Sequence, residues 1–173
     1  MKEEIVFTEA PGDEKTLWEK ILILLLGLFL LFLLLGYFLF PLDTFASLID
    51  SETIHDGLVE QDVTVRFENG SYEALLERYN EYLREEFKVC LLGNYDGVYH
   101  VTSIYDVAMY EQAFDHVVSE PCPDETLIAL HSHPYRQCLA SAQDLKSLEK
   151  MQEVNPNGLI GIMCEAERFS FYA

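Results

Sequence analysis

The stretch TLIALHSHPYRQCLASAQDL, residues 126–145, predicts a buried strand that runs through a short loop into a helix. The apolar run at its start is typical of a strand in a core, and Pro134 ends that strand. Ser141 then begins a helix with apolar residues on one face. Because side chains on a strand alternate between faces, His131 and His133 are expected to project to the same side.

The region before this stretch predicts a strand and a helix. VTVRF, residues 63–67, is rich in β-branched residues and is followed by the turn residues Asn69 and Gly70. Ser71 is expected to cap the next helix. That helix has one apolar face at helical spacing, formed by Tyr72, Leu75, Leu76, Tyr79 and Leu83.

Four further apolar runs predict strands. Residues 87–93 and 98–107 are separated by a glycine-containing turn and are expected to form a hairpin, whereas 108–125 shows no clear pattern. Residues 159–165 and 168–172 supply two final strands. The chain is therefore expected to hold an α+β domain with one mostly antiparallel sheet and flanking helices.

An uncharged apolar run precedes this domain at residues 21–40. As a helix it would rise about 30 Å, which is the thickness of the hydrocarbon core of a bilayer. Trp18 and Tyr37 lie near its ends, where aromatic rings favour the headgroup region. The alternatives are a buried core helix, which is rarely so long and apolar, and a signal peptide, which needs a small-residue cleavage site that is not evident. We therefore expect a transmembrane anchor.

The predicted organisation has four parts. Residues 1–20 form a polar tail, 21–42 a transmembrane helix, 43–62 a linker, and 63–173 the folded domain. The anchor makes the lipid bilayer a partner of this chain, as a single-pass membrane protein.

The distribution of basic residues predicts the orientation of the anchor. Lys2, Lys15 and Lys20 precede the apolar run, and the first basic residue after it is Arg66. The positive-inside rule places the N-terminus in the cytoplasm and the domain outside. The net charge of -19 excludes nucleic acid as a partner, because phosphate backbones are bound mainly by Lys and Arg.

The two histidines of the opening stretch suggest a metal site. Both can bind one ion, and the loop 134–140 can fold back to bring Asp144 to them, which leaves a fourth position open for water. The alternative is structural, since Ser141 and Asp144 also match a helix capping box, and the two roles are compatible. The other histidines are interpreted as surface residues: His55, His100 and His116.

The pattern HxHP followed by SxxD resembles the signature of the JAMM (MPN+) zinc metallopeptidases. In that family a glutamate lies upstream in a pattern similar to ExxGxLxG, and EFKVCLLG supplies Glu86 and Gly93 in that register. Glu85 is the alternative, but it needs a one-residue shift that misplaces Gly93. Val89 stands where the family has its internal glycine, and Ala140 where it has a proline before the serine.

The resemblance covers residues 71–173 and implies an MPN/JAMM-like fold with Zn²⁺ held by His131, His133 and Asp144. It also implies that Glu86 is the general base and that Ser141 donates a hydrogen bond to the tetrahedral oxyanion. The reaction would be hydrolysis of an isopeptide or peptide bond in a protein substrate, such as a conjugate of a ubiquitin-like modifier.

Other functions use the same residues. A small-molecule amide or the adduct of a sulfur-carrier protein is an alternative substrate. A non-catalytic MPN-like scaffold and a metal-responsive module at the membrane are the alternatives to an enzyme. A domain outside the cytoplasm also conflicts with a modifier that is removed in the cytosol.

The four cysteines lie in two kinds of surroundings. Cys90 and Cys164 lie in predicted strands and are interpreted as core residues. Cys122 and Cys138 flank the histidine strand, and the hypothesis is that they form a disulfide that braces the loop beside the metal.

Overall fold

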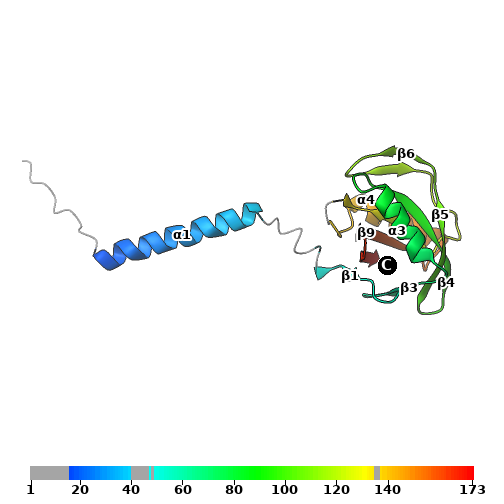
Figure 1. Ribbon diagram of the computed structural model, residues 1–173, viewed down its shortest axis with the longest axis horizontal. Helices are drawn as coiled ribbons and strands as arrows, with labels where there is room; N and C mark the ends of the chain where they lie inside the picture. Colours follow the sequence, from blue (N-terminus) through cyan, green and yellow to red (C-terminus); the bar gives the residue numbers. More distant parts are fainter. Residues whose placement is uncertain (1–15, 40–46, 48, 135–136) are drawn as a thin grey trace, which may run out of the picture. The chain divides into compact units, whose positions relative to one another are not determined.

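The protein is described by a computed structural model over residues 16–39, 47, 49–134 and 137–173. The chain divides into two compact units, Met1–Pro41 and Leu42–Ala173 (Figure 1). The first contains helix α1, and the second contains an eight-stranded sheet, a two-stranded sheet and the helices α3 and α4. The α+β class expected from the sequence is confirmed.

Helix α1 spans Leu17–Leu39 and starts four residues before the predicted span. Its start follows from a reciprocal pair of hydrogen bonds: the Thr16 amide donates to the Glu19 carboxylate (2.7 Å), and the Glu19 amide donates to the Thr16 hydroxyl (3.4 Å). The segment Leu17–Phe38 is long and apolar enough to cross a bilayer, and none of it is buried as a core helix would be. A signal sequence near the N-terminus has the same properties. Residues 1–15 of the predicted tail and 40–42 of the predicted span lie outside the described residues.

The main sheet of the second unit is mixed. Over the described residues its strand order is β1-β10-β9-β8-β4-β5-β3-β2, and five of the seven neighbouring pairs are antiparallel, while β3–β5 and β8–β9 are parallel. The two outermost strands, β1 and β2, are joined by a short turn that contains a bridge between His55 and Leu58. The two ends of the sheet therefore lie close together, and the sheet is nearly closed like a barrel. The mostly antiparallel sheet was therefore predicted correctly, but its two parallel pairs and its curvature were not predicted.

The strands of this sheet are β1 (Glu52–Thr53), β2 (Leu58–Glu60), β3 (Thr64–Phe67), β4 (Lys88–Tyr95), β5 (Tyr99–Asp106), β8 (Ile128–Ser132), β9 (Leu159–Glu165) and β10 (Arg168–Tyr172). The separate two-stranded sheet consists of β6 (Met109–Gln112) and β7 (Val117–Ser119). It lies in the segment 108–125, for which the sequence predicted no element. Both of its strands are short and contain no fully buried residue, so they carry only a weak alternating pattern.

Residues of the expected linker belong to the fold. Strand β1 pairs with β10 and β2 pairs with β3 in the antiparallel sense. Val59, in β2, is completely buried. The linker between the two units is thus shorter than the sequence indicated, because two short strands too brief for a periodic signal complete the sheet.

Helix α3 spans Ser71–Glu81 and contacts β5. The predicted turn is present, since Asn69 and Gly70 both have positive φ angles of 54° and 78°. The expected cap at Ser71 is wrong by one residue: Gly70 is the N-cap and has no capping side chain. The Ser71 hydroxyl instead donates to the Val101 carbonyl (2.9 Å) and accepts from the Glu68 amide (3.1 Å), which ties the start of the helix to β5.

The hairpin of β4 and β5 forms as predicted. Its register shifts between Leu92 and Gly93, where the strands approach so closely that a side-chain carbon at Gly93 would overlap with the His100 carbonyl. Glycine is therefore required at this position. On one face of the sheet, Leu75 of α3 packs into a core with Val89, Leu91, Ile128 and Leu130.

Candidate metal centre

Strand β8 and its last turn position the two histidines. His131 is in the strand, and His133 follows its last residue, with its amide bound to the Met163 carbonyl (3.0 Å). Both side chains are buried, and their Nε2 atoms lie 3.0 Å apart. Ser132 between them faces the other way, where its hydroxyl accepts a hydrogen bond from the Phe87 amide (3.0 Å). The expected alternation of side chains is confirmed.

Helix α4, residues Ala142–Val154, brings the third side chain. Ser141 is its N-cap, and a complete capping box is formed: the Ser141 amide donates to Asp144 Oδ2 (2.7 Å), and the Asp144 amide donates to the Ser141 hydroxyl (3.2 Å). Oδ1 of Asp144 lies 3.3 Å from Nε2 of His131. Oδ2 thus caps the helix and lies 4.0 Å from Nε2 of His133, so the same carboxylate forms the capping box and faces both histidines.

These three side chains fit a metal ion. One ligand atom from each of His131, His133 and Asp144 lies within 4.8 Å of the others. Two ligands at about 2.0–2.1 Å from a tetrahedral ion lie about 3.3–3.4 Å apart, which is close to the separations found between the ring nitrogens and from His131 to Asp144. Two imidazoles and one carboxylate are a donor set that suits zinc. The predicted residues therefore form a group that could hold a metal ion.

The loop after His133 fixes the orientation of its ring. Nδ1 of His133 donates to the Gln137 carbonyl (2.8 Å), which leaves Nε2 as the nitrogen with a free electron pair. The next residue, Cys138, is buried and bound to Cys164 by a disulfide, and its amide donates to the Ser47 hydroxyl (2.9 Å). The Tyr172 hydroxyl also donates to the Cys138 carbonyl (3.2 Å). These contacts hold the loop on the sheet.

Glu86 lies beside the histidines just before β4. Its carboxylate oxygen Oε1 is 3.7 Å from Nε2 of His133, and the residue is 6% exposed. The backbone is held by the segment between β6 and β7, since the Glu86 amide donates to the Ala113 carbonyl (2.7 Å) and the Gln112 side chain donates to the Glu86 carbonyl (3.1 Å). The neighbouring Glu85 is exposed. Of the two candidate glutamates, Glu86 is the one that the fold brings to the histidines.

The electrostatics of the site follow from burial and charge. Burial raises the pKa of Glu86 to about 7, with the Asp144 carboxylate adding to the rise and His131 opposing it. Burial lowers the pKa of His133, as does the proximity of His131. Burial alone would raise the pKa of Asp144, but hydrogen bonds to His131 and Ser141 and the charge of His131 outweigh it, so that this pKa lies well below its usual range.

An open groove of about 800 Å³, called the metal groove below, surrounds the His-His-Asp group and Glu86. Glu86, His131, His133, Ser141 and Asp144 all contribute to its lining. The hairpin of β6 and β7 forms one wall with Phe114, Asp115, His116, Val117, Val118 and Ser119. The His-His-Asp group is therefore reachable from solvent.

Of the three histidines expected at the surface, His55 and His116 are exposed and His100 is half-buried. His100 is held by the Glu68 carboxylate (2.8 Å) and lies away from the metal groove. His116 is exposed, as the sequence predicts, and it also lines the groove, where Nδ1 lies 3.0 Å from the Asp115 carboxylate. His116 reaches the groove because it lies in the turn between β6 and β7. The sequence did not predict this hairpin, so it gave no indication that His116 lines the groove.

The expected disulfide between Cys122 and Cys138 is wrong. The structure pairs Cys90 with Cys122 and Cys138 with Cys164. Strand β8 lies between β4 and β9, so the segment that enters it passes Cys90 on β4, and the loop that leaves it passes Cys164 on β9. A disulfide does hold the loop after His133, as predicted, but Cys138 is bonded to Cys164, for which the sequence predicts only a position in the core.

The fold and the site define an α+β protein with a buried His-His-Asp group that could hold a metal ion. The N-terminal apolar helix and the two disulfides are typical of a protein that enters the secretory pathway. No known family model matches the chain, and no curated protein matches it either.

Proposed function

We propose that this protein is a membrane-anchored zinc metallopeptidase that hydrolyses an isopeptide or peptide bond. The observation that carries the proposal is the meeting of four side chains: the ring nitrogens of His131 and His133, Oδ1 of Asp144, and the Glu86 carboxylate 3.7 Å from His133. The resemblance of HxHP, SxxD and the upstream Glu86 to JAMM metallopeptidases supports the same assignment.

His131, His133 and Asp144 would hold the zinc. When bound at such a site, zinc lowers the pKa of a water ligand to about 7 and polarises a carbonyl group. The Nδ1 hydrogen bond of His133 to Gln137 keeps its Nε2 available as a ligand. The hydrogen bonds of Asp144 to the capped helix hold its carboxylate in place.

Glu86 would move the proton. A carboxyl group with a pKa of about 7 exchanges protons readily at neutral pH, so it can accept one from the attacking water and deliver it to the leaving amine. Ser141 lies at the start of α4 and lines the same groove, where its hydroxyl can donate to the oxygen that becomes negatively charged. The hydroxyl already accepts from the Asp144 amide, which fixes its position.

The substrate class that the resemblance implies is a protein conjugate, including a conjugate of a ubiquitin-like modifier. The groove has a volume of about 800 Å³ and is open to solvent, so it has room for a short segment of chain. A small-molecule amide and the adduct of a sulfur-carrier protein are alternative substrates for the same residues.

We further propose that α1 stays in the membrane as an anchor and that the folded unit lies outside the cytoplasm. The lysines before the helix and the two disulfides favour the same side. Protease treatment of intact cells would digest the folded unit if it is outside, and would leave it intact if it is in the cytoplasm. A mature chain that lacks α1 would instead identify the helix as a signal sequence.

The full chain in detergent micelles tests the enzyme. Zinc is measured by elemental analysis, and turnover by cleavage of peptides and isopeptide-linked conjugates. Glu86→Gln should keep its zinc and lose about 10²- to 10⁴-fold in turnover, the usual contribution of a general base. Glu85→Gln, an exposed neighbour, is the matched control and should remain close to wild type.

Each alternative has its own result. Zinc without any turnover would indicate a metal-responsive module, and a chain that binds no zinc would indicate a scaffold. Full turnover by Glu86→Gln would contradict the assignment of Glu86 as the base.

A further inference from the structure

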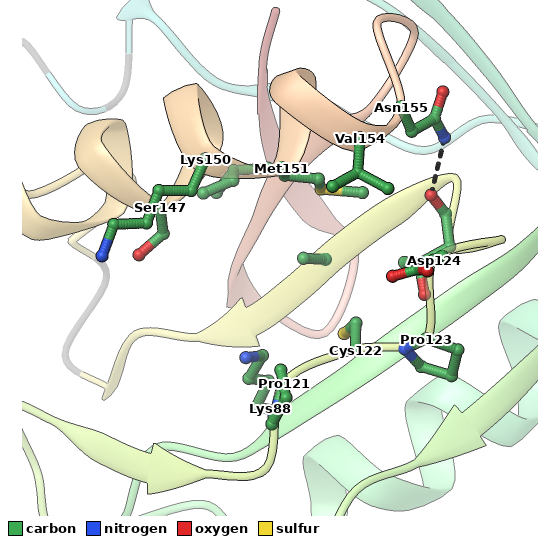
Figure 2. A pocket seen from close by; sticks show the side chains of 13 residues that line it. Lys88, Pro121, Cys122, Pro123, Asp124, Ser147, Lys150, Met151, Val154 and Asn155 are labelled. Atoms are coloured by element: carbon green, nitrogen blue, oxygen red, sulfur yellow. Dashed lines mark hydrogen bonds between the residues drawn. The ribbon is translucent and has the colours of Figure 1, made fainter.

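A second groove opens beside the metal groove. It has a volume of about 320 Å³ and lies between α4 and the segment that leads into β8. Figure 2 shows Ser147, Lys150, Met151 and Val154 of α4 on one side and Lys88 with Pro121, Cys122 and Pro123 on the other. Most of its lining is apolar, and this volume is at the small end of ligand pockets, so it suits a short segment of a ligand.

The two grooves join. Four residues line both of them: Lys88, Ala129, Ser147 and Ile160. Ala129 lies on β8 two residues before His131, and Ser147 lies on α4 one turn after Asp144. A chain bound at the metal groove can therefore continue into the second groove.

Lys88 lies at this junction. It is two residues after Glu86, and its Cα pairs with that of His131 across the ladder of β4 and β8. The side chain is half-buried, and it has no hydrogen-bond or ion-pair partner among the residues that the structure describes. A partly dehydrated cation without a partner favours an anionic ligand.

The charge of the second groove contrasts with the rest of the protein. The chain has 30 acidic residues and only 11 lysines and arginines. Two of these lysines, Lys88 and Lys150, line this small groove, against one acid, Asp124. A cationic groove in so acidic a protein indicates that the ligand contributes negative charge.

We propose that the second groove is a substrate subsite in which Lys88 binds a carboxylate, either an acidic side chain close to the scissile amide or the free carboxylate of the leaving group. This inference rests on the proposed peptidase function, because the bound carboxylate belongs to a substrate only if the protein cleaves one. The apolar lining would contact the aliphatic part of the same residue, and Lys150 would add charge at the rim.

The first test measures binding without metal, because a carboxylate would also bind zinc. Metal-free full-length protein in detergent micelles is titrated by NMR with acetyl-glycyl-glutamate amide, with acetyl-glycyl-glutamine amide, and with acetyl-glycyl-glutamine that has a free carboxyl end. We expect one of the two acidic probes to bind about 10- to 100-fold more tightly than the neutral probe. The probe that binds identifies the source of the carboxylate.

Three variants make this test specific. Lys88→Met keeps most of the side-chain volume and should remove the preference, whereas Lys88→Arg keeps the charge and should retain it. Lys146→Met, on the exposed side of α4, is the matched control for loss of one positive charge and should bind like wild type. Equal binding of all three probes to wild type, or an unchanged preference in Lys88→Met, overturns the subsite.

The second test uses the zinc-loaded enzyme and substrates that differ only in the acidic residue. The ratio of kcat/KM for the acidic over the neutral substrate should fall about 10-fold or more in Lys88→Met, mainly through KM. If no substrate is cleaved but the binding preference persists, the peptidase proposal fails and the subsite stands. If cleavage occurs without any preference in wild type, the subsite fails and the peptidase stands.

Discussion

The Nδ1 atom of His133 donates a hydrogen bond to the carbonyl of Gln137, 2.8 Å away, and so the loop that follows the histidine determines which ring nitrogen faces the site. The next residue in that loop, Cys138, is bound to Cys164 on β9. The orientation of a candidate metal ligand therefore depends on a covalent link to a neighbouring strand.

Removal of this disulfide should weaken metal binding. In Cys138→Ser/Cys164→Ser the loop loses its covalent attachment, and the zinc affinity should drop about 10- to 100-fold, as is usual when the support of a ligand is lost. The affinity is measured by competition with a chelator. Cys90→Ser/Cys122→Ser is the matched control: each pair should lower the free energy of unfolding by about 2–4 kcal/mol, but only the first should change zinc affinity. Equal affinities in both variants would contradict this role of the loop.

The hydroxyl of Ser47 should contribute to the stability of the same loop. It accepts the Cys138 amide at 2.9 Å, and both residues are completely buried. Ser47→Ala leaves that amide without this acceptor, so the free energy of unfolding should decrease by about 1–3 kcal/mol. Chemical denaturation followed by circular dichroism measures this. Ser103→Ala, at an exposed position on β5, is the control, and a Ser47 variant as stable as this control would refute the prediction.

The pair of Arg78 and Asp106 should make stability depend on acid. Arg78 donates to both carboxylate oxygens of Asp106 at 2.9 Å, and these hydrogen bonds hold the pKa of Asp106 below its ordinary value of 3.8. A lowered pKa in the folded state stabilises the fold above pH 3.8 and loses this effect as the pH falls through the folded-state pKa.

Asp106→Asn should therefore lower the free energy of unfolding at pH 6 by about 1 kcal/mol or less, since both side chains are more than one third exposed. The difference in unfolding free energy between the variant and wild type should vanish towards about pH 2–3, where carboxyl groups of this kind become protonated. Urea unfolding at several pH values measures it. The exposed Asp62→Asn serves as the control. A difference that grows on acidification would have the wrong sign.

The parts of the fold that depend on neighbouring residues were predictable from the sequence. The alternation along TLIALHSH, residues 126–133, placed both histidines on one face, and the Ser141 and Asp144 spacing predicted the capping box. These signals are local, because the period of a strand and the first turn of a helix are set by residues within a few positions. The meeting of Asp144 with the two histidines also required the loop 134–140 to fold back, which the resemblance to JAMM metallopeptidases implied.

The parts that depend on strand order were not predictable. The disulfides follow from β8 lying between β4 and β9, which no local pattern encodes. The role of Gln137 uses a backbone carbonyl, so its residue type carries no signal. Lys88 carries no local signal either, because only the pairing of β4 with β8 places it opposite His131. The hairpin of β6 and β7 is short, and its residues show no clear alternation of apolar and polar side chains. It is held in place by tertiary contacts, such as the hydrogen bond from Gln112 to the Glu86 carbonyl, which no local pattern indicates.

The zinc content of the purified full-length protein tests the central claim most directly. After incubation with zinc and removal of the excess, elemental analysis should find about one zinc per chain in wild type and in His100→Ala, and less than about a tenth as much in His131→Ala/His133→Ala. Wild type without zinc, or a double variant that retains it in full, would contradict the assignment of these side chains as metal ligands.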